Sequence, residues 1–229
     1  MKNIVVFTGA GISAESGIKT FRDTGGLWDE YDIKDVATPE AWERNPILVL
    51  DFYNARRKQV MEAQPNTAHK ALVELEKKFN VQIITQNVDD LHERAGSKKV
   101  LHLHGEIMKA RSTADPSIVH TLKSSNLLLG DKCKKGSQLR PHIVWFGELV
   151  PNMELAYLLV EKADILIVTG TSLNVHPAAG LVEYAPRDSA KYIIDPNEVN
   201  LLMEEGFTYI KKNAGNGLPE LCQKLLNEK

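Results

Sequence analysis

Short apolar runs recur along the chain, and amphipathic stretches separate several of them. The runs lie at Asn3–Thr8, Val81–Thr85, Ile165–Thr169, Tyr192–Ile194 and Phe207–Ile210. Short, β-branched runs that alternate with helical patterns are typical of a parallel sheet whose faces are covered by helices. The pattern therefore predicts an α/β protein with a parallel sheet and helices on both of its faces.

Three of the intervening stretches have apolar residues three and four positions apart, which is the spacing of one buried helix face. The first helix is expected to start at Thr67, the second to cover Asn152–Ala163, and the third to lie at the C-terminal end. The positions expected to be buried are Leu72, Leu75 and Phe79, then Leu155, Leu158, Leu159 and Ala163, and finally Leu218, Leu221, Cys222 and Leu225.

Two stretches interrupt this alternation. Residues from about 21 to 64 contain Pro39 and Pro46 followed by a long helical pattern, and residues from about 107 to 140 are polar and poor in strand signals. Both are interpreted as excursions from the sheet that pack together as a small inserted lobe. The expected division of this single unit is a core of about 1–20, 66–104 and 143–229, with a lobe of about 21–65 and 105–142.

Composition and charge limit the expected partners and cellular location of the protein, but they do not indicate an activity. The chain has 229 residues, 43% hydrophobic and 25% charged, with a formal net charge of −2. No bulk field favours nucleic acid or an anionic membrane, and we expect neither as a partner. The two cysteines and the absence of a recognisable signal peptide or membrane-length apolar stretch predict a soluble cytoplasmic protein.

The first block with candidate chemistry directly follows the run that ends at Thr8. Gly9-x-Gly11-x-x-Ala14 fits a dinucleotide-binding pattern, in which glycines let the backbone approach a pyrophosphate and the following helix offers unpaired N–H groups. This makes the predicted sheet Rossmann-like. Phe21 and Arg22 follow within a short loop that could close over a cofactor.

Two further polar blocks follow predicted strands, where open α/β sheets bind their ligands. Asn87 and Asp89 come after Thr85, and could either hold a ribose or an amide or merely cap the next helix. Gly170, Thr171 and Ser172 offer hydroxyl and backbone N–H groups after the run that ends at Thr169.

A fourth block contains two histidines, His102 and His104, followed by Gly105 and Glu106. Strand-like alternation puts both imidazoles on one side of an extended segment. One of them could act as a base beside a cofactor, since imidazole titrates near neutral pH. The alternatives are a structurally satisfied histidine and a two-histidine metal site, of which the metal site ranks lowest, because nothing nearby supplies the other ligands at a recognisable spacing.

Taken in order, these blocks resemble the sirtuins, the NAD-dependent protein-lysine deacylases. The matching pieces are GAGISAESGI with Phe21-Arg22, TQNVDDLHERAG from Thr85, HLHGE from His102, IVWFGE from Ile143, and GTSLNVHP from Gly170. The resemblance spans nearly the whole chain. It implies NAD as a consumed cosubstrate and acylated-lysine proteins as substrates.

The resemblance also implies a role for individual residues. His104 falls on the catalytic base. The cofactor-binding positions are Gly9, Ala10, Gly11, Ala14, Phe21, Arg22, Trp28, Gln86, Asn87, Asp89, Gly170, Thr171, Ser172, Asp195 and Ala214, of which the last two lie where the family contacts adenosine. The substrate peptide is expected to pair with Val144, Phe146, Gly147 and Glu148. In the implied mechanism the acyl oxygen captures the sugar as nicotinamide leaves, and His104 then removes a proton from a ribose hydroxyl, giving free lysine and O-acyl-ADP-ribose.

Tyr53 and Arg56 indicate which acyl group is removed. They are three residues apart in a predicted helix and so share one face, where a guanidinium and a phenol suit a carboxylate. Taken alone, the pair would be interpreted as a surface arginine packed on a tyrosine. The match to the branch of sirtuins similar to bacterial and mitochondrial desuccinylases reverses this, so Tyr53 and Arg56 are predicted to bind succinyl-lysine, alongside deacetylation.

The chain departs from the family at the structural zinc site, for which most sirtuins carry four cysteines. Only Cys133 lies between His104 and Phe146. A closed site needs four ligands, so we expect no zinc, although Cys133, His120, His142 and Asp131 could improvise a site. Apolar contacts from Leu122 and from Leu127 to Leu129 are expected to hold the lobe instead.

Two other functions compete with the acyl-lysine hydrolase. One is an ADP-ribosyltransferase or NAD glycohydrolase on the same scaffold, and the other is a non-catalytic NAD-binding module. Intact His104, Asn87 and Asp89 argue against the module, while Tyr53 and Arg56 favour the deacylase over the transferase. The sequence does not define the oligomeric state, and a monomer is favoured.

Overall fold

A computed structural model describes residues 1–20, 30–197 and 206–228. Its centre is a six-stranded parallel sheet with the spatial order β3-β2-β1-β7-β8-β9. The strands are β1 (Asn3–Thr8), β2 (Asn80–Thr85), β3 (Val100–His102), β7 (Ile165–Thr169), β8 (Ala190–Ile194) and β9 (Phe207–Ile210). All five apolar runs form strands of this sheet, and the predicted fold class is confirmed.

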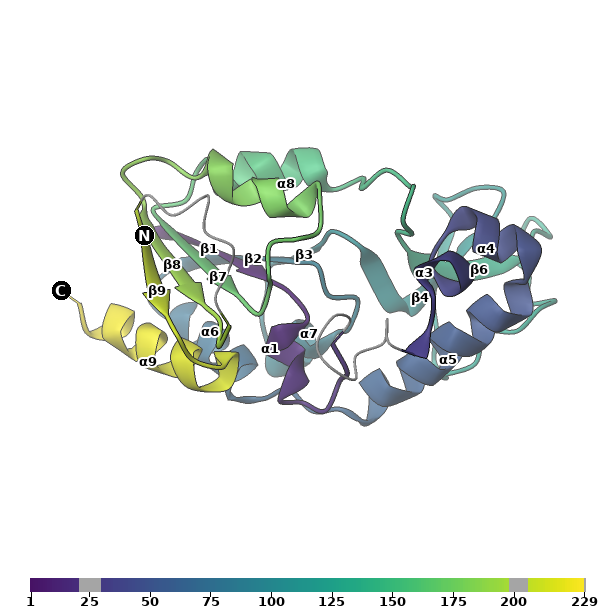
Figure 1. The fold of residues 1–229 in the computed structure, drawn as a ribbon, viewed down its shortest axis with the longest axis horizontal. Helices are drawn as coiled ribbons and strands as arrows, with labels where there is room; N and C mark the ends of the chain where they lie inside the picture. The colour runs from purple at the N-terminus through teal and green to yellow at the C-terminus, as the bar shows by residue number, and fades with distance from the viewer. Residues whose placement is uncertain (21–29, 198–205, 229) are drawn as a thin grey trace.

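The alternation of side chains along β1 explains why both faces of the sheet are covered. Ile4 and Val6 point to one face, which α1 (Gly11–Ala14), α6 (Thr67–Leu75) and α9 (Ala214–Asn227) cover. Val5 and Phe7 point to the other, where α8 (Met153–Val160) and the 3-10 helix η1 (Ala178–Tyr184) pack. Figure 1 shows α8 on one side of the sheet, with α6 and α9 on the opposite side.

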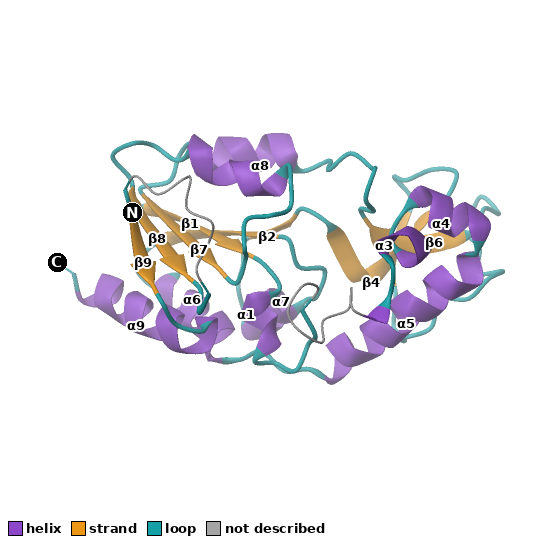
Figure 2. Ribbon diagram, viewed as in Figure 1, coloured by secondary structure: helices purple, strands orange, loops and turns teal. Residues whose placement is uncertain are grey.

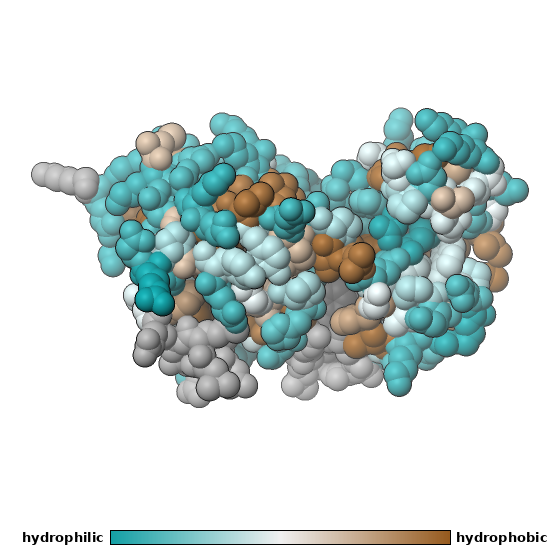
Figure 3. Space-filling view, turned by 90° about the horizontal axis from the view of Figure 1, so that it is seen from above, coloured by the Kyte–Doolittle hydropathy of each residue, from teal (hydrophilic) through white to brown (hydrophobic). Residues whose placement is uncertain are grey.

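The helix stripes were predicted correctly in two of three cases. Leu72, Leu75 and Phe79 are buried, although Phe79 lies beyond the end of α6, and the whole C-terminal stripe with Cys222 is core. In α8 the prediction was wrong for Leu155 and Leu158, which are each 48% exposed. The buried side of α8 instead consists of smaller or more flexible residues, Met153, Ala156 and Val160. Figure 3, seen from the side that carries α8, shows hydrophobic surface on that face.

The remaining elements form a second layer of structure beside the sheet, which we call the small lobe. It consists of α3 (Ile33–Val36), α4 (Pro39–Arg44), α5 (Pro46–Glu62), β4 (Gly105–Ser112), β5 (Val119–Thr121) and β6 (Leu139–Ile143). Figure 2 shows these helices and strands together at the end of the molecule opposite the two termini. Pro39 and Pro46 do not break a helix; each occupies the first position of one, behind the capping residues Thr38 and Asn45.

The three-stranded antiparallel sheet β5-β4-β6 was not expected from the polar composition of residues 107–140. This sheet buries few apolar side chains, since Ile107 and Ala110 are the only buried apolar residues of β4. One face of the sheet packs on α5. Arg57 of α5 fastens that packing, because its buried guanidinium donates to the carbonyl oxygens of Ile107 and Ser125, both at 2.7 Å.

α7 (Leu91–Ala95) follows β2 and completes the set of described helices. Within the described ranges, no helix combines the length and the apolar character needed to cross a membrane.

Candidate active site

A cavity of about 470 Å³ lies between the sheet and the small lobe. Its volume falls in the range of small-molecule and cofactor sites. One wall comes from the loops after β1, β2 and β7, and the other from α5 and the segment after β6. β1 and β7 are the neighbouring central strands at which the strand order reverses, so the cavity opens at the topological switch point of the sheet.

Most of the predicted site residues line this cavity. They are Ala10, Gly11, Ala14, Tyr53, Arg56, Gln86, Asn87, His104, Val144, Phe146, Gly147, Glu148, Gly170, Thr171, Ser172, Asp195 and Ala214. Gly9 and Asp89 lie just behind the lining, and Phe21, Arg22 and Trp28 lie outside the described residues.

The glycine-rich turn differs in one respect from the sequence expectation. The N–H of Gly9 donates to the carbonyl oxygen of Thr169 at 3.1 Å, and that of Gly11 to Gly170 at 2.9 Å. Gly11 is the first residue of α1, so the expectation of unpaired N–H groups at the start of this helix is wrong for Gly11. The two glycines let two loops touch, since a Cβ on Gly9 would lie 2.6 Å from the carbonyl oxygen of Gly170.

A buried chain of hydrogen bonds orients the polar groups after β2. Ser13 of α1 donates through Oγ to Oδ2 of Asp89 at 3.0 Å and accepts from Nδ2 of Asn87 at 3.1 Å. Asp89 also caps the next helix, because its Oδ1 accepts from the N–H of Leu91. Burial raises the pKa of Asp89, while the bonds from Leu91 and Ser13 favour its charged form. Sequence reasoning missed Ser13, whose only signal was its place in the first motif.

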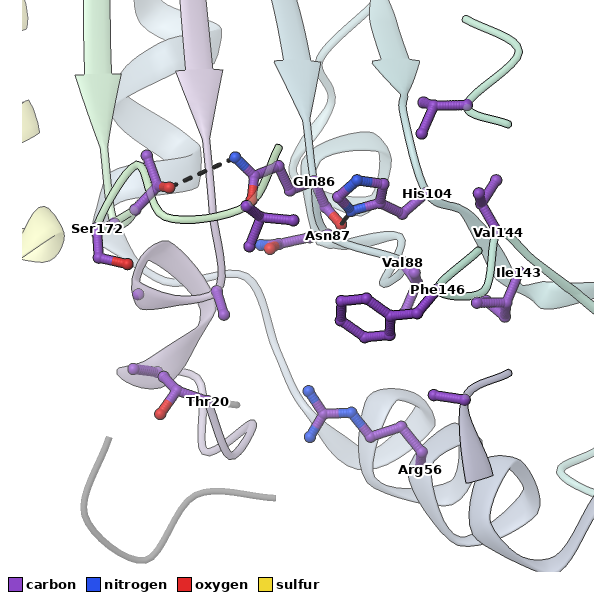
Figure 4. Close-up of a pocket in the computed structure, with 18 of the residues that line it drawn as sticks. Thr20, Arg56, Gln86, Asn87, Val88, His104, Ile143, Val144, Phe146 and Ser172 are labelled. Atoms are coloured by element: carbon purple, nitrogen blue, oxygen red, sulfur yellow. Dashed lines mark hydrogen bonds between the residues drawn. The ribbon is translucent and has the colours of Figure 1, made fainter. Parts of the chain in front are cut away.

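His104 projects into the cavity from the loop after β3, close to Gln86 and Asn87 (Figure 4). Its Nδ1 lies 3.1 Å from the carbonyl oxygen of Gln86. A carbonyl oxygen can only accept, so Nδ1 carries the proton and Nε2 keeps its lone pair. Burial lowers the pKa of His104, which keeps the ring neutral at physiological pH. The arrangement makes His104 suitable as a general base.

His102, the other histidine of the motif, does not line the cavity. Its Nδ1 lies 2.8 Å from the carbonyl oxygen of Asn87 and its Nε2 lies 2.8 Å from a carboxylate oxygen of Glu93. Burial would lower the pKa of His102, but the bond to Glu93 outweighs it and raises the pKa. His102 therefore has a structural role, and the two histidines differ in function because their partners differ.

Arg56 and Tyr53 form the opposite end of the cavity. Both residues are only 6% exposed. The side chain of Arg56 extends from α5 into the cavity (Figure 4). Burial lowers the pKa of Arg56 to about 10, so the guanidinium remains a cation at neutral pH. Tyr53 accepts a hydrogen bond from Nε1 of Trp145 at 3.0 Å, and burial raises its pKa well above the ordinary value. A buried cation beside a phenol can bind an anionic group.

Glu148 fixes the segment that leads from β6 along the cavity. Its carboxylate accepts from Arg140 at 2.7 and 3.0 Å, from Arg111 at 3.0 Å, and from the backbone N–H of Trp145 at 2.8 Å. Burial would raise its pKa, but these partners hold the pKa of Glu148 below its usual value. The carboxylate thus acts on its own chain, clamping the wall that carries Val144 and Phe146.

Several lining residues were not predicted as members of the site. They are Glu15, Thr20, Ala37, Phe52, Val88, Ile143, Trp145, Val150, Val175, His176, Pro177 and Asn213. Ile194, Pro196 and Asn197, which lie with Asp195 where the resemblance implies adenosine contacts, also line the cavity. Asn213 follows the parallel strand β9 and could have been found by the carboxyl-end rule. Trp145 lies inside the IVWFGE motif, between Val144 and Phe146, whereas Phe52 carries no such signal, because its position depends on the packing of distant segments.

Cys133, the one cysteine of the small lobe's sequence, is surrounded by apolar side chains among the described residues. Cys133 packs with Leu50, Ala110, Leu127 and Leu139, and its Sγ lies 3.4 Å from Oγ of Ser112. Nowhere in the described part of the chain do three or more His, Cys, Asp or Glu side chains gather as a metal ion would require. The expected apolar contacts are confirmed for Leu122 and Leu127, but Leu128 and Leu129 are exposed.

Comparisons with known proteins agree with this geometry. The model of the Sir2 family matches residues 9–177. An NAD-dependent protein deacylase of Bacteroides thetaiotaomicron is 55% identical over 99% of both chains, and one of Helicobacter pylori is 54% identical over 99% of this chain and 98% of its own.

Solved structures give the same result. A Sir2 homologue in complex with NAD is 42% identical, with a TM-score of 0.88 over 98% of this chain and 90% of that one. A Sir2–p53 peptide–NAD⁺ structure is 30% identical, with a TM-score of 0.81 over 98% and 94%. The sirtuin resemblance is thereby confirmed, and the chain belongs to the Sir2 family.

Proposed function

We propose that this protein is an NAD-dependent protein-lysine deacylase that removes acetyl and succinyl groups. The observation that carries the proposal is the position of His104, a neutral, half-buried imidazole in one cavity with a polar sheet edge on one side and a buried cation, Arg56, on the other. The names of the relatives, NAD-dependent protein deacylases, support the same activity.

NAD would lie along the sheet edge, where Ala10, Gly11, Gly170, Thr171 and Ser172 line the cavity. When bound, it supplies a sugar carbon activated by the loss of nicotinamide. The small side chains leave room for a pyrophosphate, and Asn87, held through Ser13, presents its amide to the nicotinamide and ribose. Asp195 and Ala214, also in the lining, would contact the adenosine end. Gly9 and Asp89 would support this wall from behind.

His104 would move the proton. With Nδ1–H donated to the carbonyl oxygen of Gln86, Nε2 accepts a proton from a ribose hydroxyl that then attacks the acyl carbon. One water molecule would be consumed as the acyl–nitrogen bond breaks, and the products would be the free amine of lysine, nicotinamide and an acylated ADP-ribose. Neutral His104 is required, and the lowered pKa secures it.

The acyl chain would extend from His104 toward Arg56 and Tyr53. Because Arg56 is a buried cation, a terminal carboxylate there gains charge-assisted hydrogen bonds that an acetyl group cannot make. The same cavity accepts acetyl-lysine without using the pair. Malonyl and glutaryl groups share the terminal carboxylate and belong to the same substrate class.

Protein substrates would lie against the segment with Val144, Phe146, Gly147 and Glu148, which the arginine clamp holds in place. Sir2–peptide complexes among the similar structures support a peptide substrate. A cytoplasmic location is part of the proposal, and the two free, buried cysteines support it.

The proposal includes a small lobe that folds without zinc. Arg57 and the apolar cluster around Leu127 would take the place of the metal in joining β4 to α5. Elemental analysis of protein purified without chelators should find no stoichiometric zinc; one zinc per chain would contradict this part.

Mass spectrometry of acetyl-, succinyl- and glutaryl-lysine peptides, incubated with and without NAD, tests reaction class and acyl range together. We expect NAD-dependent loss of the acetyl and succinyl groups with matching formation of O-acyl-ADP-ribose. Consumption of NAD without deacylation would contradict the proposal and favour a glycohydrolase. No consumption of NAD would favour a binding module.

A further inference from the structure

A hydrogen bond joins two segments of the lobe wall that are far apart in sequence. Nε1 of Trp145 donates to Oη of Tyr53 at 3.0 Å, across a separation of 92 residues. Both residues line the cavity and both are buried. Trp145 lies in the segment after β6, and Tyr53 lies one helical turn from Arg56 on α5.

The direction of this bond decides what the Tyr53 hydroxyl can do. An indole N–H can only donate, so the phenol oxygen accepts and its own proton is left for a second partner. Within the described residues, Trp145 is the hydrogen-bond partner of Tyr53. The hydroxyl is thereby set as a donor on the wall that also carries Arg56.

Trp145 is itself held in place on three sides. The guanidinium carbon of Arg140 lies 3.3 Å from the centre of its ring, and the Trp42 ring packs at 5.9 Å. Its backbone N–H donates to Glu148, whose carboxylate also binds Arg140. An indole packed this way cannot turn its N–H away from Tyr53 without breaking the clamp.

We propose that Trp145 is a positioning residue for acyl selectivity, which fixes the Tyr53 hydroxyl as a hydrogen-bond donor to the terminal carboxylate of a succinyl-type substrate beside Arg56. The inference rests on the proposed deacylase function and deepens it. An acetyl group has no carboxylate, so the contribution of Trp145 is confined to the acidic acyl chains.

Trp145→Phe removes the indole N–H and keeps an aromatic ring against Arg140. We expect KM for a succinyl-lysine peptide to rise about three- to tenfold relative to KM for the acetyl-lysine peptide, the size of one net hydrogen bond. The ratio of the two kcat values should change much less. Trp42→Phe is the matched control, because it keeps an aromatic ring against Trp145 and leaves the indole N–H of Trp145 on Tyr53. It should leave the KM ratio unchanged.

A double-mutant cycle shows whether Trp145 acts through Tyr53. In a Tyr53→Phe background, Trp145→Phe should add little, because the hydroxyl that it orients is gone. Independently of activity, Tyr53→Phe should move the indole N–H resonance of Trp145 in a ¹⁵N spectrum and leave that of Trp42 in place.

Each outcome has one interpretation. Equal losses for acetyl and succinyl peptides in Trp145→Phe, or additive effects in the cycle, would overturn the inference and leave the deacylase function intact. The same holds if the wild-type protein removes acetyl but not succinyl groups. A wild-type protein that removes neither would overturn the proposed function, and the inference with it.

Discussion

At the sheet edge, the cavity wall is made of loop backbone and small side chains that directly follow β1, β2 and β7, whereas at the small lobe it is made of large buried side chains from α5 and the segment after β6. The first wall follows from the topology of a parallel sheet, which brings the carboxyl ends of its strands together. The second follows from packing between segments about a hundred residues apart, such as Tyr53 with Trp145. The comparison teaches that one wall suits a cofactor common to a fold, and the other can set the choice of substrate.

His104 lies between the two walls, and its removal should have the largest effect. His104→Ala is expected to reduce deacylation about 10²- to 10⁴-fold, because general-base help of that size is lost. Exchange of labelled nicotinamide into NAD precedes the proton transfer and should suffer far less. Comparing both rates in one preparation checks this, and full deacylation in the variant would show that another group is the base.

Arg56 tests the lobe wall alone. Arg56→Met should lower kcat/KM for succinyl-lysine peptides about tenfold to a hundredfold more than for acetyl-lysine peptides, because a charge-assisted hydrogen bond is lost. Arg56→Lys keeps a cation but not the planar fork, and should fall between the two. An equal loss for both peptides would mean that Arg56 only supports the fold.

The smallest effect concerns the pH dependence of the sheet-edge chemistry. Burial lowers the pKa of His104 below the ordinary histidine value of 6.5, so the base stays neutral and active as the pH falls to that value. Activity should be lost only at still lower pH, as His104 becomes protonated. A pH profile of kcat for deacetylation measures this loss of activity on the acidic side. An acidic midpoint above pH 6.5 would contradict the lowered pKa of His104.

His102→Gln serves as the control for that profile. His102 bonds Glu93 outside the cavity lining, so its loss can change the rate but should leave the acidic midpoint where it is.

Sequence reasoning reached the sheet-edge wall almost completely, since strand ends followed by polar or glycine-rich blocks have a defined place in this fold. It erred there in one physical detail, the N–H group of Gly11 at the start of α1, because that group donates to Gly170 in a loop far away in sequence. Ser13 was missed for a similar reason, as its hydroxyl matters only through Asn87 and Asp89.

The lobe was harder to predict. Its sheet is stabilised by buried polar contacts of Arg57 rather than by an alternating hydrophobic pattern, so residues 107–140 carried little strand signal. The spacing of Tyr53 and Arg56 correctly predicted that both lie on α5, and Trp145 lies within the IVWFGE motif. The hydrogen bond between Trp145 and Tyr53 could not be predicted, because no periodicity relates Trp145 to α5. In α8, the spacing of leucines misled, since Leu155 and Leu158 share a face that points to solvent.

The contact between Gly9 and Gly170 restricts the relative motion of the loops after β1 and β7. The two backbones touch there without an intervening side chain that could change its conformation. Hydrogen bonds from Gly9 to Thr169 and from Gly11 to Gly170 also join the segment after β1 to the end of β7, at the centre of the sheet. If the cavity widens when a ligand enters, we expect the change at the lobe wall, which is made of side chains rather than of backbone in contact. Engineering for new acyl groups then has more freedom at the lobe wall than at the sheet edge.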